Sequence, residues 1–114
     1  MPDTDFDSLP LFDTDFVDRL RDAIGEKDLM DLMAFLPEEG RRVLNEVHHA
    51  RKTGDLTQVL VVTHGLKGGA GNFGIVRLEA IARAMNNKDA TLEEIEELAV
   101  HLERCIADLD AELA

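Results

Sequence analysis

Residues 61–78 combine one histidine with a lysine and several glycines at short spacing. The stretch reads VVTHGLKGGAGNFGIVRL, and Lys67 follows His64 after two intervening residues. A neutral imidazole is available near pH 7 and is a competent nucleophile toward an activated phosphoryl group. A phosphoryl group adds roughly two negative charges, which a neighbouring lysine partly offsets. These residue types are therefore suited to carrying a phosphoryl group on His64.

The apolar residues around His64 have the spacing of a helix, which fixes the direction in which the imidazole points. Successive helical residues lie about 100° apart around the axis. On this wheel His64 lies about 160° from the centre of an apolar stripe that spans roughly 80°. His64 is therefore expected to face water. The stripe, which is expected to face the core, consists of Val59, Val62, Leu66, Ala70 and Phe73.

The face that carries the imidazole also holds glycines and apolar side chains. Gly68 and Gly71 share this face, and Lys67 lies on its flank. Val61 and Ile75 share it as well. We predict that these two apolar residues and Gly71 contact a docked partner, although packing at the periphery of a bundle explains the apolar pair equally well.

Five glycines, at positions 65, 68, 69, 71 and 74, interrupt this helix-like segment. Each costs about 0.5–1 kcal/mol in a helix relative to alanine. A loop would explain them, but the apolar spacing continues through them and no proline or Asn-Gly turn signal intervenes. We interpret the glycines as clearing access to the histidine for a large partner.

The segment resembles the signature of histidine phosphotransfer (HPt) domains, the intermediate carriers of phosphorelays. The resemblance rests on HxLKG at positions 64–68, followed by Gly74 and Leu78, and extends from the first predicted helix to the C-terminus. In that family the histidine lies in the middle of a helix of a four-helix bundle and accepts a phosphoryl group on a ring nitrogen. The chain departs from the family at Thr63, where alanine is usual, and at Asn86, where glutamate is common.

The resemblance implies roles for three residues and a class of partner. His64 would be phosphorylated, Lys67 would give electrostatic support, and Gly68 would give clearance. The partner would be the receiver domain of a response regulator or hybrid histidine kinase, which brings the acceptor or donor aspartate and its Mg²⁺. No cofactor or metal of the chain's own is expected.

Several motifs of other protein classes are absent or incomplete. The sequence has no P-loop, no kinase signature and no carboxylate cluster for magnesium, so it is expected neither to bind ATP nor to phosphorylate itself. Glycines 69, 71 and 74 match the dinucleotide fingerprint, but no strand directly precedes them and no second strand pattern exists. His48 and His49 point about 100° apart on a helix, which disfavours a shared metal ion.

Length and charge exclude some classes of protein. The 114 residues suit one domain, and the net charge of −12 argues against nucleic-acid binding. Residues 51–88 nevertheless hold six basic and two acidic side chains, which either attract an acidic partner or are ordinary helix surface. No apolar run could span a membrane and no signal peptide is evident, so a soluble, cytoplasmic protein is expected. Cys105, the single cysteine, is expected to be a small buried hydrophobe.

The periodicity along the chain predicts an all-α fold. Residues 1–12 are acidic and contain two prolines, so a flexible tail is expected, although Phe6, Leu9 and Leu11 could attach part of it to the domain. Residues 13–114 form the HPt-like domain, an antiparallel up-and-down four-helix bundle with one or two additional N-terminal helices. The predicted segments are 13–24, 29–36, 38–52, a helix after Asp55 that carries His64, 78–85, and a last helix that begins with a capping box at 91–94.

Two functions from different classes follow. The favoured one is a monomeric phosphocarrier that passes a phosphoryl group between receiver or kinase domains through His64. The alternative is an HPt-like interaction module that binds and regulates a kinase or receiver without carrying phosphate. The intact histidine and lysine favour the carrier, because a binding module has no chemical need of either.

Overall fold

A computed structural model describes residues 5–114 of the chain, which form helices and connecting turns without a strand. The first turn, η1 (Phe6–Ser8), is a short 3₁₀ helix. Six α-helices follow: α1 (Thr14–Ile24), α2 (Glu26–Met33), α3 (Phe35–Thr53), α4 (Thr57–Asn72), α5 (Val76–Met85) and α6 (Leu92–Leu113).

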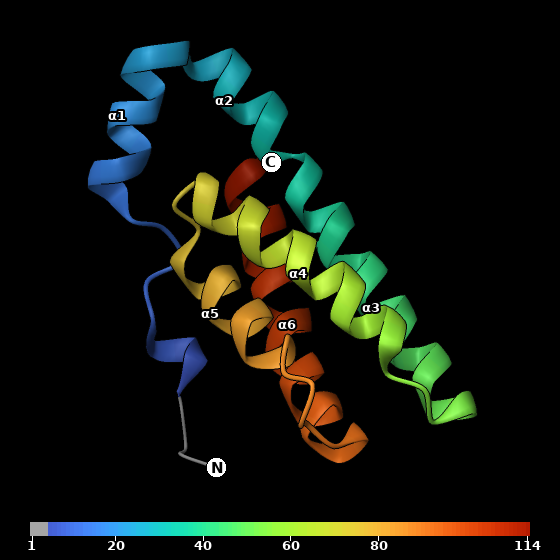
Figure 1. The fold of residues 1–114 in the computed structure, drawn as a ribbon. Coiled ribbons are helices and arrows are strands. Elements are labelled where there is room, and N and C mark those ends of the chain that lie inside the picture. The colour runs from blue at the N-terminus through green and yellow to red at the C-terminus, as the bar shows by residue number, and fades with distance from the viewer. Residues whose placement is uncertain (1–4) are drawn as a thin grey trace.

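Helices α3 to α6 form the bundle, and each runs antiparallel to the one before it (Figure 1). Helix α3 contacts α4, α4 contacts α5, α5 contacts α6, and α6 contacts α3, which closes the ring. Helices α1 and α2 extend from one end of this bundle and lead into α3 (Figure 1). The predicted all-α, antiparallel four-helix bundle with additional N-terminal helices is therefore confirmed, and the additional helices number two.

The helix ends show which local signals were correct. Thr91 Oγ1 accepts a hydrogen bond from the Glu94 backbone N–H, and the Glu94 carboxylate accepts one from the Thr91 N–H, both at 3.1 Å. The predicted capping box is thus confirmed. Helix α3, by contrast, begins at Phe35 and not at the predicted 38. Pro37 lies in the first turn of α3, where a backbone N–H has no partner within the helix. A new helix thus starts close to this proline, at Phe35, after α2 has ended at Met33.

Part of the predicted tail packs against the bundle through apolar side chains, among them Phe6, Leu9 and Leu11, which we expected could attach it. Residues 1–4 of the predicted flexible tail lie outside the described residues. Phe6 is 4% exposed and lies with its ring centroid 5.3 Å from that of His101 on α6. Arg77 on α5 donates two hydrogen bonds to the Leu9 carbonyl, at 2.8 and 3.0 Å. Asp7 forms an ion pair with Arg104 at 3.0 Å. The few apolar residues of this acidic segment therefore outweigh its charge and prolines.

Replacing Phe6 with alanine should lower the free energy of unfolding by up to about 3 kcal/mol. Replacing a buried aromatic residue with alanine usually lowers the free energy of unfolding by about 3–5 kcal/mol. We expect the low end of this range, because a terminal segment can detach without unfolding the bundle. Urea denaturation followed by circular dichroism would measure the change. An unchanged midpoint would mean that the segment does not pack in solution, and Asp5→Ala, a change at an exposed residue of the same segment, is the control.

Cys105 is fully buried on α6, as predicted. Burial raises the pKa of its thiol to about 12, so the reactive thiolate is scarce at neutral pH. Within residues 5–114, no helix is both long and apolar enough to cross a membrane.

Candidate functional site

Helix α4 holds His64 on the outside of the bundle. Val59, Leu66 and Ala70 are each at most 1% exposed, whereas His64 is exposed. The predicted orientation of the imidazole is therefore confirmed. At the start of the helix the Asp55 carboxylate accepts hydrogen bonds from the Thr57 hydroxyl at 2.6 Å and backbone N–H at 2.9 Å, which lower the pKa of this carboxyl group. The sequence suggested Asp55 as the N-cap of this helix, but the N-cap position is occupied by Leu56, and Asp55 instead bonds Thr57, the first helical residue.

The prediction that Ile75 contacts a partner is wrong, because Ile75 is fully buried. Helix α4 ends at Asn72, and Gly74 has a left-handed backbone conformation with φ of 66°. A helical wheel applies only within one helix, so it fails beyond this turn. Ile75 instead donates a backbone hydrogen bond to Ala70 O at 3.0 Å and packs in the core.

The glycines of α4 fall into two groups according to what a side chain would meet. At Gly69 a Cβ atom would lie 3.0 Å from Leu36, and at Gly71 it would lie 2.5 Å from the Glu79 carboxylate. A side chain at Gly69 would thus require a small shift of Leu36. At Gly71 the nearby atom is the end of the flexible Glu79 side chain, which can move aside, so contact of Gly71 with a partner stays a prediction.

Gly65 and Gly68 form the second group and lie beside His64. Both are exposed, and no other part of the described chain would come within 4 Å of a Cβ atom at either position. Their backbone is helical, so neither glycine is needed for its conformation. Glycine destabilises a helix, and within residues 5–114 neither packing nor backbone conformation requires it at these two positions.

Lys67 lies half-buried on the flank of His64, one turn further along α4. It forms no ion pair with any acidic side chain of residues 5–114. A lysine without an internal partner is available to a charge that arrives at the histidine. Val61, the other predicted partner contact on α4, is 59% exposed.

Thr63 and Asn86, the two departures from the HPt pattern, contact each other beneath the site. Thr63 is fully buried, and its hydroxyl donates to Val59 O at 2.7 Å. The Asn86 side-chain amide donates to Thr63 Oγ1 at 3.0 Å and to Leu60 O at 2.8 Å. A hydroxyl that enters the core at Thr63 is thus fully hydrogen-bonded, and Asn86 ties the end of α5 to the turn of α4 before His64.

The coupling between Thr63 and Asn86 should be measurable by a double-mutant cycle. Thr63→Val and Asn86→Ala should each lower the free energy of unfolding by about 1 kcal/mol, because each removes at least one hydrogen bond. The double variant should lose about 0.5–1 kcal/mol less than the sum, since both changes remove the same contact. Chemical denaturation of the four proteins measures these values, and strict additivity would contradict the contact.

A shallow groove adjoins His64 toward the start of α4. Its lining combines Thr57, Leu60 and Val61 with His64, and Asn86 and Lys88 complete it from the turn after α5. Figure 1 shows α4 and the turn between α5 and α6, which carry these residues. Lys88 and Leu60 were not among the residues predicted for the site. The excess of basic residues between positions 51 and 88 was the available signal for Lys88.

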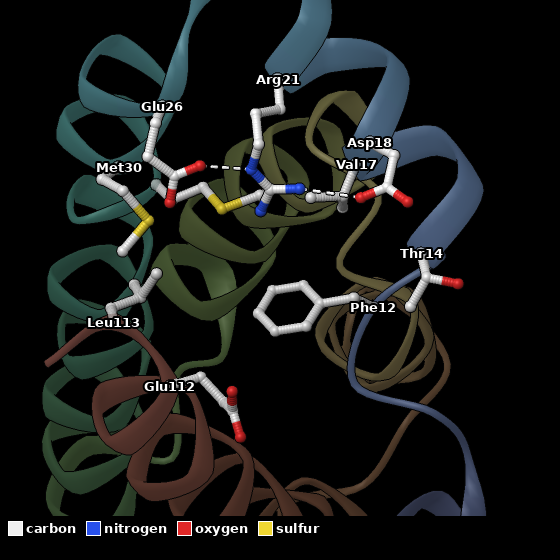
Figure 2. A pocket seen from close by; sticks show the side chains of 10 residues that line it. Phe12, Thr14, Val17, Asp18, Arg21, Glu26, Met30, Glu112 and Leu113 are labelled. Atoms are coloured by element: carbon white, nitrogen blue, oxygen red, sulfur yellow. Dashed lines mark hydrogen bonds and ion pairs between the residues drawn. The ribbon is translucent and has the colours of Figure 1, made fainter.

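A separate cavity of about 250 Å³ lies between α1, α2 and the end of α6. Figure 2 shows Arg21 held between Glu26 and Asp18 above the ring of Phe12, with Leu113 of α6 opposite. None of the residues predicted for phosphoryl chemistry lines this cavity. It belongs to the packing of the N-terminal helices on the bundle.

Metal chemistry has no support in the described residues. His48 and His49 are both exposed on α3. Within residues 5–114 no group of three or more His, Cys, Asp or Glu side chains is arranged to hold a metal ion.

The chain matches a known family. The family model described as "Hpt domain" matches residues 14–112, which include α3, α4, α5, all of α6 except its last residue, and the whole of the His64 site. Neither the curated proteins nor the solved structures contain a match to the chain.

Proposed function

The chain belongs to the Hpt domain family, which serves phosphotransfer in phosphorelays, and from this premise we propose that His64 is the residue that carries the phosphoryl group. The observation that carries the proposal is the clearance around His64. Gly65 and Gly68 leave the exposed imidazole on bare backbone, and the fold itself does not require either glycine.

In the proposed transfer, an unprotonated ring nitrogen of His64 attacks the phosphorus of an aspartyl phosphate on a receiver domain. The new P–N bond forms as the bond between phosphorus and the aspartate oxygen breaks, and the aspartate leaves as a carboxylate. Transfer to a second receiver reverses these steps. The attacking and leaving atoms must lie in line, which an exposed histidine with open flanks permits.

Lys67 and the partner both stabilise the negative charge of the transferred phosphoryl group. The ammonium group of Lys67 lies one turn from His64 and offsets part of the negative charge of the transferred group. The receiver supplies Mg²⁺ together with its aspartate. The chain itself is a carrier without ATP-dependent kinase activity, and it works as a monomer in the cytoplasm, where one exposed face suffices for one partner at a time.

The test is phosphoryl loading from a small panel of phosphorylated receiver domains in the presence of Mg²⁺. Acid-labile phosphate should appear on the wild-type protein with at least one receiver, because a P–N bond hydrolyses in acid. Transfer should also run in reverse to an unphosphorylated receiver. Absence of label across the panel, with binding still detected, would overturn the carrier proposal.

A further inference from the structure

The groove beside His64 places a second lysine within the same surface. Lys88 lies in the turn after α5, and the groove extends from it past Val61 to His64. We propose that this groove binds the receiver domain through an apolar contact at Val61 and an ion pair between Lys88 and a carboxylate of the receiver. The inference rests on the proposed function. It adds Lys88, which lies outside the HxLKG signature, as a residue that selects the partner.

The distribution of ion pairs singles out Lys88. Eight of the twelve lysines and arginines form ion pairs with acidic side chains of residues 5–114. The four without such a partner in that range are Arg19, Lys52, Lys67 and Lys88. Two of these four border His64, one on its flank and one along the groove. In a protein with a net charge of −12, both lysines are therefore free to pair with a carboxylate from outside residues 5–114.

The walls of the groove suit a protein surface better than a small anion. Val61 is 59% exposed, the highest value among the five exposed large apolar side chains of residues 5–114. Leu60 is half-buried beneath it. An open groove that combines apolar walls with one cation fits an apolar side chain and a nearby carboxylate, such as a receiver would present around its phosphorylated aspartate.

The groove is also preorganised. Asn86, which forms part of its lining, donates hydrogen bonds to Leu60 O and Thr63 Oγ1. The turn that carries Lys88 is held by a hydrogen bond from the Asp89 N–H to the Asn87 side chain at 3.0 Å and by another from the Ala90 N–H to Asn87 O at 3.1 Å. Lys88 is therefore presented from a fixed turn next to a fixed floor, which lowers the entropy lost on binding.

The experiment compares Lys88→Glu with the wild type in transfer from the receiver that loads the protein. The second-order rate constant should fall about tenfold at roughly 20 mM salt, and the difference should shrink at about 0.5 M salt because screening removes the attraction. Arg19→Glu is the matched control. It makes the same change in net charge at another exposed, unpaired cation, on α1, and should change the rate little.

A second measurement separates docking from chemistry. Phosphoramidate, a small phosphoryl donor without a protein surface, should load Lys88→Glu and the wild type at the same rate. If the wild type accepts phosphate from a receiver but Lys88→Glu matches it at every salt concentration, the groove proposal is wrong while the carrier function stands. If the variant fails with phosphoramidate as well, Lys88 acts on the chemistry or the fold and the docking role is excluded. If no receiver loads the wild type, the proposed function itself fails, and the groove proposal fails with it.

Discussion

Replacing His64 with glutamine should abolish acid-labile phosphorylation while leaving the fold and the affinity for the receiver unchanged. Glutamine keeps a polar side chain of similar length but offers no nucleophilic nitrogen. His64 is exposed and makes no side-chain hydrogen bond within residues 5–114, so the fold loses nothing that the structure shows. Phosphate transfer from a labelled receiver gives the first readout, and titration calorimetry with the same receiver gives the second.

This pair of measurements decides between a carrier and an interaction module. A carrier loses all transfer in His64→Gln and still binds its receiver. A module that only binds and regulates would retain its effect on the partner in the variant, and the wild type would acquire no phosphate. His49→Gln, a change at another exposed histidine, on α3, is the control for substitution itself and should transfer at the wild-type rate.

Substituting Gly68 with glutamine should slow phosphoryl transfer by about 100-fold without destabilising the protein. A displacement of about 1 Å between reacting groups can reduce a rate by this factor, and a long side chain one turn from His64 would keep the receiver at a distance. The fold has room for the side chain, because a Cβ atom at Gly68 meets nothing within 4 Å in the described chain. Stopped-flow or rapid-quench transfer assays measure the rate, and thermal denaturation measures the stability.

Gly68→Ala is the matched control, because it adds only the Cβ atom. It should raise the free energy of unfolding by about 0.5–1 kcal/mol through helix propensity. A Gly68→Gln variant that transfers as fast as the wild type would show that this glycine is not kept for clearance. A variant that unfolds would show instead that the glycine serves packing, contrary to the open space around it.

The sequence predicted the features that depend on a single helix. His64 faces water because one continuous period of 3.6 residues relates it to Val59 and Leu66, and this relation holds anywhere within α4. The same argument failed at Ile75, because the chain had already left the helix at Gly74. Periodicity alone does not distinguish a glycine with positive φ from the helical glycines before it; the resemblance to HPt domains, in which the later glycine lies near the helix end, was the available signal for Gly74.

The spacing of apolar residues within one helix could not predict the contacts between helices. Thr63 and Asn86 are 23 positions apart, and only the packing of α4 against α5 brings the hydroxyl and the amide together. The two kinds of glycine also look alike in sequence. A Cβ atom at Gly71 would meet the end of the Glu79 side chain, whereas one at Gly68 would meet nothing within 4 Å in the described chain, and the difference appears only once α5 is in place.

The predicted tail shows the limit of composition. Its aspartates and prolines favour flexibility on average, but the free energy of docking depends on individual side chains. Phe6 fits against α6, and Arg77 meets the Leu9 carbonyl, which only the position of α5 could reveal. Packing of Phe6 and Leu9, together with the hydrogen-bonded Leu9 carbonyl, therefore holds residues 5–12 against the bundle.

Lys67 and Lys88, which form no ion pair within residues 5–114, would link the charge beside His64 to the proposed phosphorylation. Together they contribute two positive charges, and a phosphoryl group on the histidine would add roughly two negative ones. If His64 carries phosphate as we propose, loading would offset the charge of these two lysines. A receiver that has just given up its phosphoryl group would then leave a surface that attracts its carboxylates less than the empty protein does. Release of that receiver would follow from the transfer itself, without a change of conformation.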